Sequence, residues 1–105
     1  MSELESKEYS WRWVTANELL SRTPCELCCA IAYSDGEAIE NTALYDGEST
    51  TGRLIANLNS GVKAEISLEP KEPIYCCRGL YVEIGENTEG VFVQWREIPQ
   101  GIGYS

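Results

Sequence analysis

The sequence predicts an all-β protein: an antiparallel β-sandwich of about seven or eight strands with jelly-roll-like connections. The strongest observation is a pair of runs, residues 80–84 and 91–95, in which an apolar residue occupies every second position, and therefore one face, without exception. A polar loop bounded by glycines, residues 85–90, separates them, and this is the pattern of two half-buried antiparallel strands. The second observation is the regular recurrence of turn-forming sequences such as Asp46-Gly47 and Asn59-Ser60-Gly61. Short strands with turns at this spacing are typical of a sandwich or barrel.

The chain is expected to start with a flexible acidic segment, residues 1–8, ahead of a single domain over residues 9–97. Residues 9–14 alternate and indicate a strand or an extended arm. The sequence Thr15-Ala16-Asn17-Glu18 then fits a capping box and precedes two leucines. Residues 9–23 therefore form an arm or contain at most one short helical turn.

The middle of the chain supplies the remaining strand candidates. Residues 25–33 are apolar on both faces, so this strand is either central in the fold or covered by another subunit. Residues 38–45 and 51–58 are further strand candidates, and residues 62–69 alternate as a strand with one apolar face. The last residues, 98–105, contain a proline and two glycines and are expected to form a flexible tail.

Composition excludes several classes of protein. With 105 residues the chain is one domain, and 17 acidic against 8 basic residues give a formal net charge of −9. This charge repels phosphate backbones and anionic lipid surfaces, so we expect neither a nucleic-acid partner nor a membrane partner. The acidic N-terminus differs from a secretory signal, which predicts a cytoplasmic product.

The residues needed for common catalytic sites are missing. The chain contains no histidine, which removes the usual general base and the imidazole metal ligand, so we predict that it is not an enzyme.

Five cysteines leave a metal or redox site open. Cys25, Cys28, Cys76 and Cys77 are the candidate zinc ligands. Neighbouring strand residues such as Cys76 and Cys77 point to opposite faces, however, and free cysteine is commonly a small buried hydrophobe. The sequence therefore predicts reduced thiols with no metal and no cofactor.

The alternation also separates core from surface. The predicted core residues of the C-terminal runs are Leu80, Val82, Ile84, Val91, Val93 and Trp95. Two aromatic residues fall on the opposite face, and two tryptophans near the N-terminus are difficult to bury in so small a domain. We therefore expect a homo-oligomer, with a trimer as one candidate. The interface candidates are Trp11, Trp13, Cys28, Ala30, Ala32, Tyr81 and Phe92.

Four segments carry a resemblance to a known group of proteins: Leu44-Tyr45-Asp46-Gly47, Gly52-Arg53-Leu54-Ile55, Gly79-Leu80-Tyr81-Val82 and Gly90-Val91-Phe92-Val93-Gln94-Trp95. They resemble short β-sandwich proteins encoded in phage and prophage structural-gene clusters, over roughly residues 40–97. The resemblance implies a virion-associated decoration, head or tail component that oligomerises and contacts other virion proteins. The doubled cysteines depart from that pattern.

The expected function is therefore that of a non-enzymatic structural protein that self-associates. Two alternatives stay open. One is a small module that binds a sugar or peptide through the loops holding Asp35, Asp46 and Glu86. The other is a cysteine-ligated zinc or redox protein.

Overall fold

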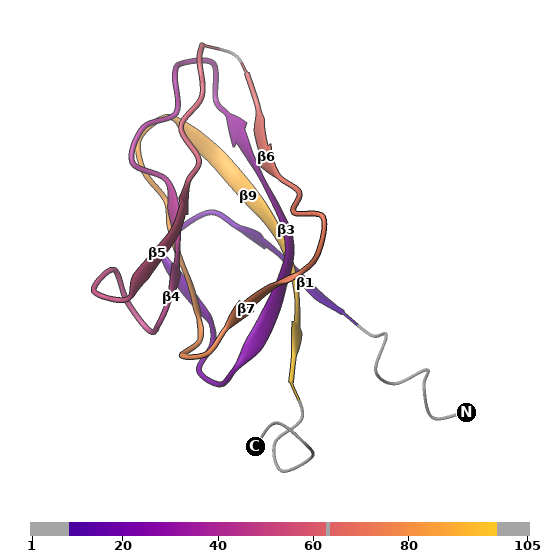
Figure 1. Ribbon diagram of the computed structural model, residues 1–105. Coiled ribbons are helices and arrows are strands. Elements are labelled where there is room, and N and C mark those ends of the chain that lie inside the picture. Colours follow the sequence, from indigo (N-terminus) through magenta and orange to yellow (C-terminus); the bar gives the residue numbers. More distant parts are fainter. Residues whose placement is uncertain (1–8, 63, 99–105) are drawn as a thin grey trace.

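The described residues of the computed structural model, 9–62 and 64–98, form nine β-strands and no helix. They build two antiparallel sheets packed face to face, which confirms the predicted β-sandwich (Figure 1). Sheet A has the order β1 (Ser10–Val14), β9 (Thr88–Glu97), β3 (Cys25–Ser34) and β6 (Ile66–Leu68), and β7 (Ile74–Cys76) pairs with the other end of β3. Sheet B has the order β2 (Glu18–Ser21), β8 (Leu80–Glu83), β4 (Ala43–Asp46) and β5 (Arg53–Asn57).

The strand pairing is that of a jelly roll. The first four strands pair with later strands in reverse order: β1 with β9, β2 with β8, β3 with β6 and β4 with β5. Successive pairs lie alternately in sheet A and sheet B, as in a long antiparallel hairpin that has been rolled up. The short β7 is an addition to this plan, and it raises the strand count above the seven or eight expected.

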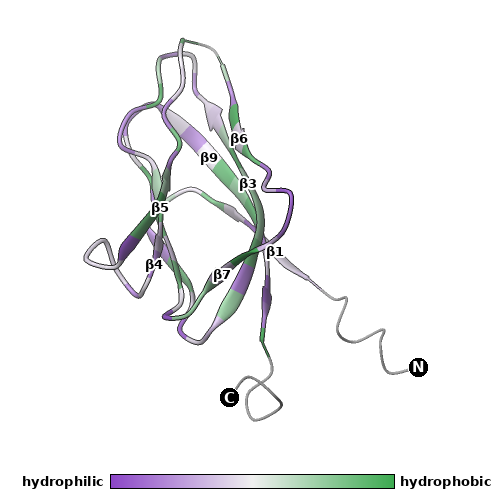
Figure 2. Cartoon of the chain, viewed as in Figure 1, coloured by the Kyte–Doolittle hydropathy of each residue, from purple (hydrophilic) through white to green (hydrophobic). Residues whose placement is uncertain are grey.

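The core lies between the sheets and has the composition that the alternation predicts. Leu80, Val82, Val91 and Val93 are completely buried and Trp95 is nearly so. The remaining predicted core residue, Ile84, is partly buried against the same cluster. Figure 2 shows hydrophobic residues along β3 and β7, whereas much of the loop surface is polar.

The apolar strand over residues 25–33 is β3, and it lies in the centre of sheet A. It pairs with β9 along its whole length and with β7 and β6 at its two ends. Leu27 and Ala30 point into the core, while Cys29 and Ile31 lie half-buried on the outer side. Of the two explanations for its apolar faces, the central position is confirmed.

The N-terminal region is built of strands, so the strand considered for residues 9–14 is confirmed and no helical turn follows it. Residues 10–14 form the edge strand β1, and Leu19 pairs with Tyr81 in β2–β8. The side chain of Asn17 does not cap a helix; it accepts a hydrogen bond from the backbone N–H of Ile84 at 2.7 Å. Pairing with a neighbouring strand satisfies more backbone groups than one isolated helical turn could.

The flexible ends expected at residues 1–8 and 99–105 lie outside the described residues. Ile98 is described, and it does not belong to a loose tail. Its side chain is 5% exposed, and its N–H donates to the carbonyl of Pro24 at 3.1 Å.

The two alternating runs form strands, as expected, but these strands do not pair with each other. β8 pairs with β2 and β4 in sheet B, whereas β9 pairs with β1 and β3 in sheet A. The loop between them passes from one sheet to the other and forms a bridge between Glu86 and Glu40. Tyr81 and Phe92 consequently lie on opposite outer faces of the sandwich. The strand expected over residues 62–69 is shorter in the structure, where β6 runs from Ile66 to Leu68. Val62 lies before this strand and is exposed.

Candidate functional site

The most distinctive surface feature is a set of aromatic side chains on the outer face of sheet A. Val14 on β1 points into the core and is completely buried, so Trp11 and Trp13 point outward from the same strand. Phe92 on β9 and Tyr33 on β3 project from the same side of the sheet, and we call these four residues the aromatic face. Three neighbouring strands thus place aromatic rings next to one another.

The rings of the aromatic face contact each other across the strands. Trp11 stacks on Phe92 with ring centroids 6.0 Å apart and an interplanar angle of 28°. Trp13 meets Tyr33 at 5.5 Å and 53°. It reaches Tyr33 by lying across Gly90, where a Cβ atom would come within 2.3 Å of the indole. The glycine therefore lets one tryptophan bridge β1 and β3 over the intervening strand.

The tryptophans of the aromatic face remain largely accessible. Trp11 is 65% exposed and Trp13 is 44% exposed. Two more aromatic residues are exposed beyond the margin of this face: Tyr9 contacts Arg96, and Tyr75 on β7 is opposite Glu26. Large apolar patches of this kind on a soluble protein mark sites of interaction.

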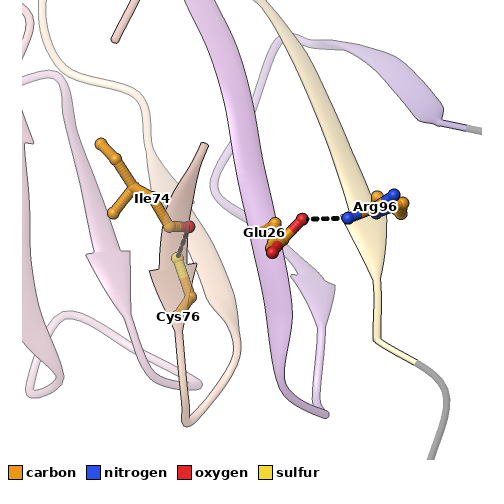
Figure 3. Close-up of polar contacts among 4 residues, drawn as sticks. All are labelled: Glu26, Ile74, Cys76 and Arg96. Carbon is orange, nitrogen blue, oxygen red and sulfur yellow. Dashed lines mark hydrogen bonds and ion pairs between the residues drawn. The ribbon is translucent and has the colours of Figure 1, made fainter. Parts of the chain in front are cut away.

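Two arginines near the aromatic face are paired with carboxylates. Arg96 on β9 forms an ion pair with Glu26 on β3 (Figure 3). The ring of Tyr9 lies under the same guanidinium at 5.5 Å, and Arg12 on β1 is paired with Glu18 at 2.7 Å. These pairs lower the number of uncompensated charges that a partner protein would meet here.

The aromatic face extends to a strand edge that pairs with no further strand in the described part of the chain, residues 9–62 and 64–98. β1 is the last strand of sheet A, and its five residue pairs with β9 run without a register shift. The opposite edge of sheet A is formed by strands of only three residues, and both edge strands of sheet B, β2 and β5, have irregular registers. Short or bulged edges resist further pairing, whereas a regular edge such as β1 can accept another strand.

The predicted interface residues fall into different parts of the molecule. Trp11, Trp13 and Phe92 lie together on the aromatic face. Ala30 and Ala32 are completely buried in the core, so their assignment to an interface is wrong. They are apolar because this face of β3 packs against the other sheet. Cys28 is half-buried where the register of β3 shifts between Leu27 and Cys29.

Tyr81 lies on the outer face of sheet B, in a row with Leu19, Tyr45 and Leu54. Only Leu54 of this row is exposed, to 50%. The hydroxyl of Tyr45 donates to the Glu83 carboxylate at 3.0 Å. Burial, together with this hydrogen bond, raises the pKa of Tyr45. The row is less accessible than the aromatic face, which has two exposed tryptophans.

The acidic residues considered for ligand binding do not converge. Asp35 and Glu86 lie at the end of the sandwich where β3 finishes, since the N–H of Asp35 bonds to the carbonyl of Asn87. Asp46 lies at the opposite end and is 5% exposed. Its carboxylate accepts hydrogen bonds from the backbone N–H groups of Cys77 and Arg78, at 3.2 and 2.8 Å. Asp46 therefore holds the turn after β7 to the end of β4.

The structure brings together only two of the four candidate zinc ligands. Cys25 and Cys76 face each other across β3 and β7 in the core. Cys77 follows Cys76 directly and is exposed, in agreement with the prediction that the two residues point to opposite faces. No cluster of three or more cysteine and carboxylate side chains suited to a metal ion occurs within residues 9–62 and 64–98. In the same ranges no helix is long and apolar enough to cross a bilayer.

One member of the aromatic face, Tyr33, and the glycine beneath Trp13 were missed from the sequence. Tyr33 could have been found, because it shares the outward face of its strand with Cys29 and Ile31. The part played by Gly90 could not, since it depends on the side chain of Trp13, which is far away in the sequence.

Comparison of the chain with known protein families, characterised proteins and solved structures finds no significant match.

Proposed function

We propose that this jelly roll is a non-enzymatic structural protein that self-associates through the aromatic face and the outer edge of β1. The observation that carries the proposal is the continuity of the two features: the tryptophans that dominate the exposed aromatic surface stand on the strand that ends the sheet. A partner that pairs with β1 would satisfy its open backbone groups and cover apolar side chains in the same step.

A second copy of the chain fits this edge in one favourable register. When two β1 strands run antiparallel about a two-fold axis at Arg12, all five residues of each strand find an opposite residue. Trp11 of each copy then stands opposite Trp13 of the other, and both pairs lie on the outer side of the joined sheet. Directly opposed aromatic residues on one face stabilise antiparallel strands. Slipping the register by one residue would set tryptophans against inward-facing side chains.

The charges are compatible with this arrangement. The two Arg12 side chains would meet near the axis, but each is paired with its own Glu18. Glu26 and Arg96 nearby compensate each other in the same way. Because a strand that pairs with its own copy closes a two-fold interface, this edge favours a dimer over the trimer considered from the sequence.

The larger assembly that we propose is a phage or prophage particle, in which the protein would be a decoration, head or tail component. Its support is the resemblance carried by the four segments from Leu44 to Trp95, together with the jelly-roll fold, which viral capsid proteins share with lectins and cupins. This step rests on analogy of fold and sequence, since a fold by itself does not specify a function.

Sedimentation equilibrium over a range of protein concentrations tests the self-association. We expect the wild-type chain to dimerise and the variant Trp11→Ser/Trp13→Ser to dissociate at least about 30-fold more readily, the equivalent of one 2 kcal/mol hot spot. Leu54→Ser is the matched control, because it removes an exposed apolar side chain from the edge strand of the other sheet. It should leave the dimer unchanged.

Two results would contradict the proposal. One is a wild-type chain that stays monomeric at tens of micromolar; the other is a control variant that dissociates as readily as the tryptophan variant. A monomer whose tryptophan fluorescence responds to soluble oligosaccharides would instead support the ligand-binding alternative.

A further inference from the structure

Cys25 and Cys76 form a thiol pair in the core that the proposed function does not use. They are directly opposite each other in the antiparallel pairing of β3 and β7. Both residues are completely buried. They lie at the end of the sandwich away from Tyr33, because Cys25 begins β3.

The geometry of this pair suits a covalent bond. Directly opposed residues in antiparallel strands have Cα atoms about 4.5–5.5 Å apart, which lies within the range of about 4.4–6.8 Å found for disulfides. The two side chains are in hydrogen-bonding contact with each other. The Sγ atom of Cys76 also lies 3.6 Å from the carbonyl oxygen of Ile74 (Figure 3).

We propose that Cys25 and Cys76 form a disulfide that fastens β7 to β3 when the chain meets a low-molecular-weight disulfide as oxidant. The thiolate of one cysteine of the pair attacks one sulfur of the oxidant and releases one small thiolate, leaving a mixed disulfide on that cysteine. The thiolate of the other cysteine then attacks this protein sulfur, the mixed disulfide breaks and a second small thiolate leaves. The protein loses two protons and two electrons, and the oxidant is reduced to two thiols.

The first step requires the two thiols to become accessible. Since neither sulfur is exposed, β7 must separate from β3 for the first step. This strand has only three residue pairs, and its central residue, Tyr75, is 53% exposed.

The other cysteines have different surroundings. The thiol of Cys29 points to the side chain of Gln94 at 3.7 Å, on the outer side of sheet A. Cys77 is exposed, with its sulfur 3.8 Å from the Asp46 carboxylate. Neither has a cysteine opposite it in the strand pairings of the described residues. The bond between Cys25 and Cys76 would fix Tyr75 beyond the margin of the aromatic face.

The test uses two complementary variants of the full chain. Cys28→Ser/Cys29→Ser/Cys77→Ser keeps only Cys25 and Cys76, and Cys25→Ala/Cys76→Ala keeps the other three cysteines. Each is refolded with glutathione disulfide and reduced glutathione, then analysed by mass spectrometry, by thiol titration in denaturant and by thermal unfolding with and without reductant.

The first variant should become two hydrogens lighter, lose both titratable thiols within a single chain and unfold at a lower temperature after reduction. The second should retain free thiols or form links between chains. The proposal is overturned if the first variant keeps both thiols, remains a glutathione adduct or links only between chains. It is also overturned if reduction leaves the unfolding temperature of the oxidised protein unchanged. Because the dimer is not measured, neither result depends on the proposed self-association.

Discussion

Replacement of Asp46 distinguishes a structural role from a ligand-binding role for this residue. The carboxylate is buried at the end of β4 and accepts two backbone hydrogen bonds, from Cys77 and Arg78. These bonds join the turn between β7 and β8, which belong to different sheets, to sheet B. Asp46→Ala removes both acceptors at once.

The expected loss follows from the number and type of these hydrogen bonds. A hydrogen bond to a charged group contributes about 1.5–3 kcal/mol. Cys77 and Arg78 are exposed, so their freed N–H groups regain water and the lower end of that range applies. We therefore expect Asp46→Ala to lower the free energy of unfolding by about 3 kcal/mol. Asp46→Asn should lose about half as much, because one amide oxygen can still accept while the amide nitrogen faces a donor.

Equilibrium unfolding in guanidinium chloride measures these differences, provided that all variants share one dependence on denaturant. Asp35→Ala is the control: among the described residues, this exposed carboxylate accepts a single local hydrogen bond, from the N–H of Glu37 at 3.2 Å. The loss for this variant should stay within about 0.5 kcal/mol. Equal losses for Asp46→Ala and Asp35→Ala would refute the reasoning. So would a loss below about 1 kcal/mol for Asp46→Ala, a value too small for two charged hydrogen bonds.

Two further predictions concern the outer faces. Gly90→Ala should displace Trp13 from Tyr33, because the new Cβ would lie 2.3 Å from the indole. The tryptophan fluorescence emission should then shift to longer wavelength and the dimer should weaken. Unchanged emission would contradict the packing of Trp13 over Gly90. Tyr45 has a raised pKa, so its contribution to stability is complete below the unfolded value of about 10 and is lost as the pH rises through the higher folded value. Above pH 10 the free energy of unfolding of the wild-type chain should thus fall more steeply with pH than that of Tyr45→Phe. Urea unfolding at several alkaline pH values measures both dependences, and equal dependences on pH would show that the Tyr45–Glu83 contact has no such effect.

The faces of individual strands could be predicted because alternation is a local property. Val91, Val93 and Trp95 face the core since every second side chain of a strand lies on the same side. The same rule predicted that Cys76 and Cys77 face opposite sides, and the structure places Cys76 inside and Cys77 outside. It also identified Phe92 as an outward-facing residue, whereas Trp11 and Trp13 were expected at the surface because a small domain has little room to bury them.

The N-terminal helix was a failure of local reasoning. Thr15-Ala16-Asn17-Glu18 has the residue types of a capping box, but Asn17 bonds to Ile84 and the following leucines join β2. Pairing with β8 supplies partners from a distant part of the chain, and tertiary contacts of this kind routinely override weak helix signals.

Alternation along the chain was sufficient to predict a β protein and the buried side of most of its strands, because side-chain direction repeats with a period of two along a strand. The identity of neighbouring strands became known from the folded structure. It put β8 and β9 in different sheets, separated Tyr81 from Phe92, set Cys25 against Cys76 and laid Trp13 over Gly90. The physical reason is that strand pairing is a contact between distant segments. Alternation specifies which face of a strand is apolar but does not specify the strand that lies beside it.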